Sequence, residues 1–110
     1  MSDVDAVFSA LADSTRREVL SQIDLRGGAT ATELAADLPV TRQAVAKHLA
    51  VLDRVGLVRS TPAGRERRYQ VDDAQLARAV AQLASVGSAW DARLQRIKRI
   101  AEAIQRTQQD

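Results

Sequence analysis

The chain contains no cysteine among its 110 residues. That absence excludes disulfide bonds, thiolate metal sites and a cysteine nucleophile. Histidine occurs once, as His48, and no apolar run approaches the length of a membrane span. The N-terminal segment is acidic and lacks the positive start and long apolar stretch of a signal peptide. We therefore expect a soluble cytoplasmic protein with no membrane partner, no bound metal and no other cofactor.

The net charge of +2 conceals an uneven distribution of charge along the chain. Residues 41–70 carry seven basic and two acidic side chains, a net charge of +5. The other eighty residues carry nine basic and twelve acidic side chains, a net charge of −3. Such asymmetry favours a polyanionic partner for the middle of the chain. A solvated basic surface without any partner explains the charges equally well at this point.

Apolar residues recur at helical spacing through most of the chain. We expect a short first helix over residues 3–11. Asp13 or Thr15 can cap a second helix, and the later residue also fits a capping box with Glu18. Glycines 27 and 28 should end that helix, because glycine readily takes the left-handed conformation found after helix ends.

Two further helices, separated by a tight turn, are expected over residues 30–55. Thr30 and Glu33 are spaced as a capping box that starts the first of them. Pro39 disfavours helical geometry at the residue before it, and Thr41 can cap the second helix. The apolar faces of the pair contain Leu34, Val45, Leu49 and Leu52.

The residue pattern changes to short alternating runs over residues 57–71. Alternation around Pro62 and Gly64 predicts a two-stranded hairpin with its tip near the glycine. Tyr69 and Val71 should point into the core. The chain as a whole is therefore expected to be mainly α, a single domain over residues 1–110 with a β-hairpin between helices.

A helix, a tight turn, a second helix and a hairpin, in that order, make up the winged helix-turn-helix plan. In that plan the second helix enters the DNA major groove and the hairpin forms the wing. The face opposite the buried row of this helix should meet DNA, and it carries Arg42, Gln43, Ala46, Lys47 and Ala50, with Thr41 as the cap at its start. Arg42 matches guanine and Gln43 matches adenine, whereas Thr41 can bond a phosphate. Lys47 can reach a base or the backbone, and the small Ala46 lets the helix approach closely.

Three arginines flank the expected wing tip, namely Arg65, Arg67 and Arg68. Phosphate or minor-groove contact is the role we expect for them. The alternative is a charged edge strand that resists aggregation. His48 lies beside the buried row of the second helix, where packing and hydrogen bonding are expected more than metal binding.

The residues quoted so far resemble the ArsR/SmtB family of winged helix-turn-helix repressors. "ALADSTRREVLSQI" is similar to its N-terminal signature, "TELAADLPVTRQAVAKHLAVLDRVGLV" to its core motif, and "RERRYQV" to its wing strand. The resemblance covers roughly residues 6 to 75. It implies a homodimer on a dyad DNA site that represses transcription, usually of its own operon, and dimerisation through the first and last helices.

Two departures from the family pattern are visible. Metal-sensing members carry cysteines before the recognition helix or His/Asp/Glu sets on the last helix. Neither set is present here, and Asp91 and Glu102 alone are poor ligands for a soft or borderline metal. Relatives also often have serine where this chain has Ala46, so one hydroxyl contact to DNA is missing. Nothing in the residues identifies an inducing ligand.

The last helix is expected over residues 89–107, after a break at Gly87 and a cap at Ser88. It carries an apolar stripe of about four turns that a small trihelical core has little means of covering, and such stripes usually mark a protein interface. An alternative is that the helix folds back on its own domain. The dimer interface we predict comprises Phe8, Leu11, Trp90, Leu94, Ile97, Ala101 and Ile104.

These observations predict a sequence-specific DNA-binding transcriptional regulator, most simply a homodimeric repressor on double-stranded DNA. A sequence-indifferent architectural DNA-binding protein would use the same basic face. A protein adaptor that binds through the last helix is a third hypothesis, which the basic wing disfavours. We expect no enzymatic activity, because no serine, histidine and acid are arranged as a nucleophile with a base.

Overall fold

The computed structural model describes residues 3–109, apart from the side chains of residues 3, 4, 83, 86, 89, 90 and 107–109. Within this part the elements follow in the order α1 (Asp3–Ala12), α2 (Ser14–Arg26), β1 (Ala29–Thr30), α3 (Ala31–Asp37), α4 (Arg42–Arg54), β2 (Val58–Ala63), β3 (Glu66–Val71) and α5 (Asp73–Gln109). The chain divides into two compact units, one up to Ala79 and one from Val80 onward.

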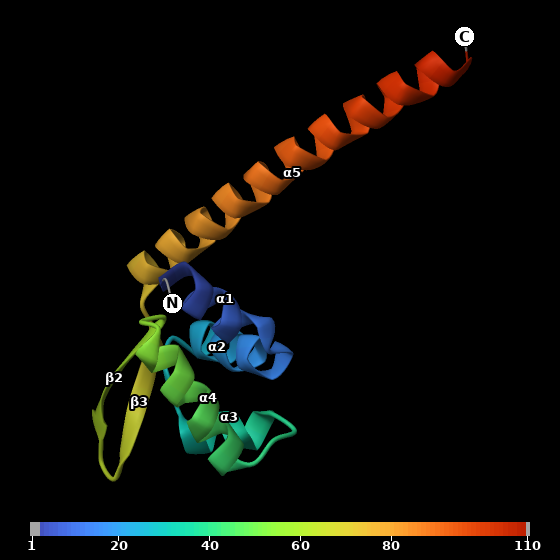
Figure 1. Ribbon diagram of the computed structural model, residues 1–110. Helices are drawn as coiled ribbons and strands as arrows, with labels where there is room; N and C mark the ends of the chain where they lie inside the picture. The colour runs from blue at the N-terminus through green and yellow to red at the C-terminus, as the bar shows by residue number, and fades with distance from the viewer. Residues whose placement is uncertain (1–2, 110) are drawn as a thin grey trace. The chain divides into compact units, whose positions relative to one another are not determined.

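Helices α1 to α4 and the sheet make up most of the first unit, and their apolar faces meet in one core. Figure 1 shows α2, α3 and α4 packed together beside the hairpin. The predicted core positions are confirmed, since Leu34, Val45, Leu49 and Leu52 have no exposed surface. Tyr69 and Val71 also pack against this core, as expected.

Helix ends follow local hydrogen-bond rules. Asp13, rather than Thr15, caps α2, because its carboxylate accepts a hydrogen bond from the Arg16 amide at 3.0 Å. Gly27 then ends α2 in the left-handed conformation, with φ of 69°. The predicted capping box of α3 is confirmed in both directions between Thr30 and Glu33. The two N-terminal caps, Asp13 and Thr30, satisfy backbone amides that a helix start leaves without partners.

The wing is part of a three-stranded antiparallel sheet in the order β1-β3-β2. Strands β2 and β3 form the predicted hairpin, which turns at Gly64 with φ of 65°. The sequence did not predict β1, whose two residues pair with Tyr69 and Arg68 of β3. A two-residue strand shows no alternation of side chains, so no pattern indicates it. Through β1, the segment between α2 and α3 is hydrogen-bonded to the wing.

Helix α5 is continuous over 37 residues, so the predicted break at Gly87 and cap at Ser88 are wrong. A single glycine inside a helix costs about 1 kcal/mol relative to alanine, which is less than the cost of ending and restarting a helix. The helix begins after Asp72, whose carboxylate accepts a hydrogen bond from the Gln75 amide at 3.1 Å. None of the described helices, including the long α5, contains an apolar stretch long enough to cross a lipid bilayer.

Shortening Leu49, one of the two buried leucines of α4, should destabilise the protein strongly. Leu49 is fully buried, so Leu49→Ala removes packed methyl groups and leaves a cavity, at a cost of about 2–5 kcal/mol. Leu25→Ala is the matched control, because Leu25 is 75% exposed and its truncation should cost under about 0.5 kcal/mol. Urea denaturation of both variants measures the difference. Equal losses of stability would contradict the described core.

Candidate nucleic-acid interface

Helix α4 presents its predicted reading face to solvent. Arg42, Gln43, Ala46 and Lys47 are all exposed, whereas Val45 on the opposite side is buried. The side chains of Gln43 and Lys47 form no hydrogen bond or ion pair within the described part of the chain, which leaves their polar groups available to a ligand. The outward side of α4 is therefore basic and polar, and its one alanine leaves the backbone accessible.

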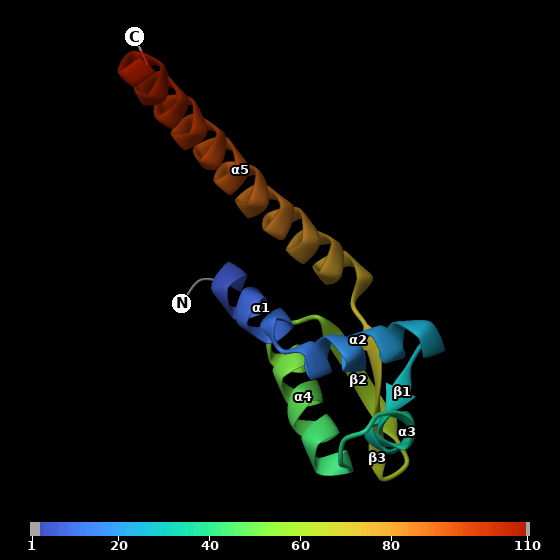
Figure 2. The same cartoon turned by 90° about the vertical axis from the view of Figure 1, so that its right-hand side faces the viewer.

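The start of α4 is held by its own cap and by the turn that precedes it. Thr41 has extended backbone geometry, and its hydroxyl accepts a hydrogen bond from the Ala44 amide at 3.1 Å. Figures 1 and 2 both show the N-terminal end of α4 and the tip of the wing at the same end of the first unit. The recognition helix and the wing can therefore face one elongated ligand together.

Arg42 does not extend freely from the start of α4. Its Nε donates a hydrogen bond to the Thr32 hydroxyl at 3.0 Å, and its Nη2 donates to Glu66 Oε1 at 3.3 Å. The Thr32 hydroxyl in turn donates to the same Glu66 oxygen at 2.7 Å. These three residues, hereafter the Arg42 cluster, join α4, α3 and the first residue of β3.

The three wing arginines have three different surroundings. Arg65 lies at the tip, is exposed and makes no hydrogen bond or ion pair within the described residues. Arg67 lies on β3 and donates to the Ser60 hydroxyl at 2.8 Å and the Ser60 carbonyl at 3.3 Å, across the hairpin. Arg65 therefore lies at the tip, whereas the Arg67 guanidinium lies along the hairpin beside Ser60.

Arg68 binds within the protein instead. Its guanidinium donates to Glu33 at 3.2 Å and to the Gly28 carbonyl at 3.0 Å. Arg26 forms ion pairs with the same Glu33 and with Asp37 of α3. These contacts fasten α3 to the end of α2 and to the wing, so Arg68 has a structural role that its position in the sequence does not reveal.

Comparison with known proteins places these features in a family. Residues 11–61 match a family described as a helix-turn-helix domain. The HTH-type transcriptional regulator Rv2034 of Mycobacterium tuberculosis is 47% identical over 73 residues, which cover 66% of this chain and 67% of the relative. The structure of an ArsR-like transcriptional regulator from Rhodococcus sp. RHA1 has a TM-score of 0.71 and 45% identity, covering 90% of this chain and 92% of that one.

This chain belongs to the ArsR family of winged helix-turn-helix regulators. The structure of the AntR antimony-specific transcriptional repressor has the same fold, with a TM-score of 0.60 and 28% identity over 80% of each chain. The ArsR-family chain is thus a DNA-binding transcriptional regulator, as its residues predicted. Helices α3 and α4 are its helix-turn-helix, and the β2–β3 hairpin is its wing.

Two acids of this ArsR-family interface have lowered pKa values. The pKa of Glu33 is lowered mainly by the hydrogen bonds from the Thr30 amide and hydroxyl, with a contribution from Arg68. The pKa of Glu66 is lowered mainly by the hydrogen bond from the Thr32 hydroxyl, with a contribution from Arg42. Both side chains are therefore carboxylates at neutral pH, and each holds an arginine that would otherwise add to the positive face.

Among the described residues of this ArsR-family chain, no three His, Asp or Glu side chains lie close enough together to bind a metal ion. His48 is half-buried on α4, and its Nδ1 is buried without a hydrogen-bond partner among the described groups. The sequence led us to expect both packing and hydrogen bonding for His48, and the described residues supply no hydrogen bond to its Nδ1.

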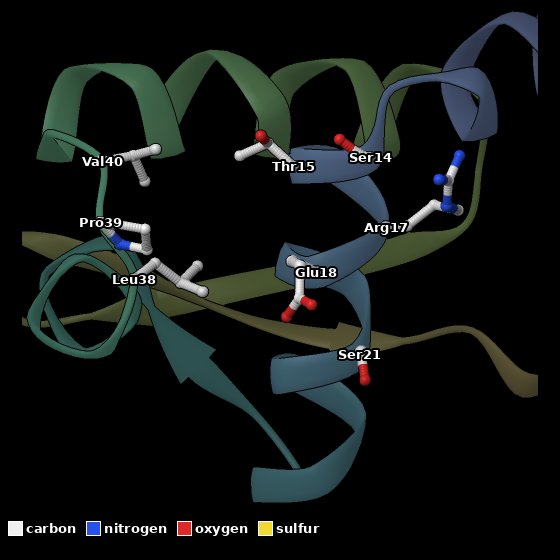
Figure 3. A pocket seen from close by; sticks show the side chains of 8 residues that line it. All are labelled: Ser14, Thr15, Arg17, Glu18, Ser21, Leu38, Pro39 and Val40. Carbon is white, nitrogen blue, oxygen red and sulfur yellow. The ribbon is translucent and has the colours of Figure 1, made fainter.

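A groove of about 460 Å³ adjoins the turn before α4. Figure 3 shows the turn residues Leu38, Pro39 and Val40 on one side and residues of α2, among them Thr15, on the other. The Arg17 guanidinium lies at the edge of the groove and donates to the Leu11 carbonyl at 2.6 Å. The groove therefore offers hydroxyl groups, apolar groups and the Glu18 carboxylate, and its one arginine is bonded to a backbone carbonyl.

Sequence reasoning missed the partners of the basic residues. Thr32 and Glu66 were not expected to contact Arg42, and Glu33 was expected only as a capping residue. One signal was available, because Glu66 is one of two acids in the otherwise basic segment 41–70. An acid among so many basic residues is expected to pair with one of them, but the sequence does not show with which one.

The capping carboxylate of α3 should make stability depend on acid pH. Because the folded pKa of Glu33 lies below its ordinary value of 4.5, the ionised group stabilises the fold above that pH. The contribution is lost as the pH falls through the folded pKa. Glu33→Gln should therefore lower the urea midpoint at neutral pH, and the deficit should shrink as the pH falls below 4.5 and through the folded pKa.

The measurement is a series of urea denaturations of wild type and variant between neutral and acid pH. Glu18→Gln, which removes an exposed acid from α2, controls for the change in net charge. A deficit of Glu33→Gln that stayed constant through the acid range would contradict the role given to the capping carboxylate.

Proposed function

We propose that this ArsR-family chain is a homodimeric repressor that binds a dyad operator, with its own promoter as a candidate target. The observation that carries the proposal is the joint exposure of the N-terminal face of α4 and the wing tip at one end of the first unit. A major groove admits one α-helix, and the wing then lies along the adjacent backbone. Two such units on a duplex would occlude a promoter.

Base reading is assigned to Gln43 and Lys47. Gln43 is exposed on the first turn of α4 and has an amide that can bond adenine through two hydrogen bonds. Lys47 follows one turn later, with Ala46 beside it leaving room for close approach. Thr41 at the helix start meets a phosphate, which the free amides of a first turn favour. Arg42 presents to DNA only the part of its guanidinium that the Arg42 cluster leaves uncovered.

Wing contact is assigned to Arg65 and Arg67. Both are exposed near the tip, and neither is paired with an acid within the described residues. Phosphate contacts of this kind add affinity without reading sequence, and they release counterions. Arg68 is left out of this assignment because Glu33 and the Gly28 carbonyl already hold it.

The dimer is assigned to the apolar seam of α5. Apolar or small residues recur along this helix at alternating intervals of four and three, at Leu76, Val80, Leu83, Gly87, Trp90, Leu94, Ile97, Ala101 and Ile104. That heptad repeat is the pattern of a coiled coil, in which a partner helix covers the seam. Leu94, Ile97 and Ile104 are each more than half exposed in the single chain. The Trp90 side chain lies outside the described residues.

The α1 part of the predicted interface divides between two roles. Phe8 is 39% exposed and can join a dimer contact, whereas Leu11 packs against the core of its own unit. A winged helix-turn-helix DNA-binding domain from Mycobacterium bovis with the same fold, at a TM-score of 0.63 and 23% identity, is described as homodimeric. Two recognition helices about 34 Å apart would read half-sites one turn apart.

Selection of bound fragments from sheared genomic DNA, combined with light scattering, tests the proposal. We expect a dimer that enriches a small set of fragments containing a dyad sequence. A footprint spread evenly over any DNA would identify a sequence-indifferent architectural protein instead. A monomer that binds no DNA even at low salt would overturn the proposal and favour the protein adaptor.

Substitutions in the recognition helix and the wing should have different effects on binding. Gln43→Ala removes a base contact, so it should reduce the preference for the enriched fragment over random duplex by about tenfold. Arg65→Ala removes a phosphate contact, so it should weaken binding to both DNAs by the same factor and make the salt dependence shallower by about one counterion. Titrations at several salt concentrations measure both. The assignment fails if Gln43→Ala leaves the preference unchanged.

A charge in the seam should separate the dimer. Ile97→Glu places a carboxylate in the seam, and the single-chain fold should tolerate it because Ile97 is 54% exposed there. We expect a monomer by light scattering and a loss of operator affinity of about 10²-fold or more, because the two half-sites are no longer bound together.

Gln95→Glu is the matched control, since it adds the same charge to the same helix at an exposed position outside the seam. It should leave the dimer intact. A dimeric Ile97→Glu variant would show that the interface lies elsewhere.

A further inference from the structure

The Arg42 cluster places an acid inside the surface assigned to DNA. Glu66 is the first residue of β3, next to the wing tip, and its side chain is 29% exposed. It accepts hydrogen bonds from both Thr32 and Arg42 through one oxygen. A carboxylate in this place opposes DNA phosphates, so its presence needs a reason other than affinity.

Stability does not supply that reason. The Arg42 side chain is 62% exposed, and ion pairs with this much solvent contribute little to folding. The hydrogen bonds instead determine how the guanidinium is oriented. Nε and Nη2 lie on the same edge of the group, and that edge faces Thr32 and Glu66. The edge formed by Nη1 and the remaining Nη2 proton is the one left to face a ligand.

An arginine held in this way differs from a free arginine in two respects. Its charge is offset by Glu66, so it adds less to the sequence-independent attraction that DNA phosphates exert on every cation. The free edge of its guanidinium points in one direction, so it forms good hydrogen bonds only with a DNA acceptor that lies in that direction. Both effects favour the correct site over arbitrary DNA.

We propose that Glu66 is a specificity-determining residue of the DNA interface, which positions Arg42 through a shared contact with Thr32 and lowers affinity for arbitrary sequences. This inference rests on the proposed function of the α4 and wing surface. Glu66 acts through Arg42 and need not touch DNA itself.

The test compares Glu66→Gln with wild type on the genomic fragment that the selection enriches and on a random duplex of the same length. Releasing Arg42 should raise affinity for the random duplex about threefold to tenfold and steepen its salt dependence by about one counterion. Affinity for the enriched fragment should change less. The ratio of the two affinities should therefore fall by several-fold or more.

Two further variants separate orientation from charge. Asp53→Asn is the matched control, because it removes the other acid of segment 41–70, from the last turn of α4, and should leave the affinity ratio unchanged. Thr32→Val keeps every charge but removes the hydroxyl that Arg42 and Glu66 share. It should lower the ratio without changing the salt dependence.

A direct readout is the Nε–H resonance of Arg42 in free protein. We expect it to be protected from exchange in wild type and in Asp53→Asn, and to lose protection in Thr32→Val, which removes the hydroxyl that accepts from Nε. Glu66→Gln should lose part of the protection, because Glu66 no longer holds the Thr32 hydroxyl as a carboxylate. The inference is overturned if wild type selects an operator while Glu66→Gln and Asp53→Asn discriminate equally well. If wild type selects no DNA at all, the proposed function fails first, so the two failures are distinguishable.

Discussion

Burial of the apolar row of α4 is the contact on which the DNA-facing surface depends. Val45, Leu49 and Leu52 are fully enclosed by the core of the first unit. Because side chains three and four residues apart share one face of a helix, enclosing this row determines the rotation of α4 about its axis. Gln43 and Lys47 then face solvent, and no side-chain hydrogen bond or ion pair among the described residues holds them there. The orientation of the reading face is thus a consequence of core packing.

Ion pairs connect the elements around that helix into one surface. An isolated two-stranded hairpin is marginally stable in water, so a wing needs support from the rest of the domain. Here β1 pairs with β3, Arg68 reaches Glu33 of α3, and Glu66 reaches both α3 and α4. The first two contacts hold the wing beside the helix-turn-helix, whereas the exposed Glu66 contacts orient Arg42. They also mean that the charge count of segment 41–70 overstates the free positive charge offered to DNA.

Helix α5 has a different relation to the chain. Its seam follows a heptad repeat, and the described apolar side chains along it from residue 80 onward remain exposed. Packing within the single chain therefore does not explain why these positions are apolar, whereas packing against a second copy of the same helix would. A regulator that reads two half-sites needs two recognition helices at a set spacing, so the seam and the reading face serve the same function in the proposal.

Local patterns were sufficient for most of the helix starts and for the core. The Thr30–Glu33 capping box, the Thr41 cap and the buried row of α4 each depend on residues three or four apart, and such spacing can be read directly from the sequence. The continuity of α5 through Gly87 could not be read in this way. Whether a helix continues through one glycine depends on the summed helix propensity of all its residues, not on the glycine alone. The family resemblance led to the same fold and to the same positions for α4 and the wing.

The sequence by itself determined which residues carry charge and which helix would face outward. Only the tertiary structure decided how those charges are used, because their partners are remote along the chain. Thr32 and Glu66 are 34 residues apart, and Arg42 and Glu66 are 24 apart. No local periodicity connects such positions, and their pairing depends on how β3 lies against α3 and α4. The division of the arginines into free, positioned and structural groups therefore came from the folded chain.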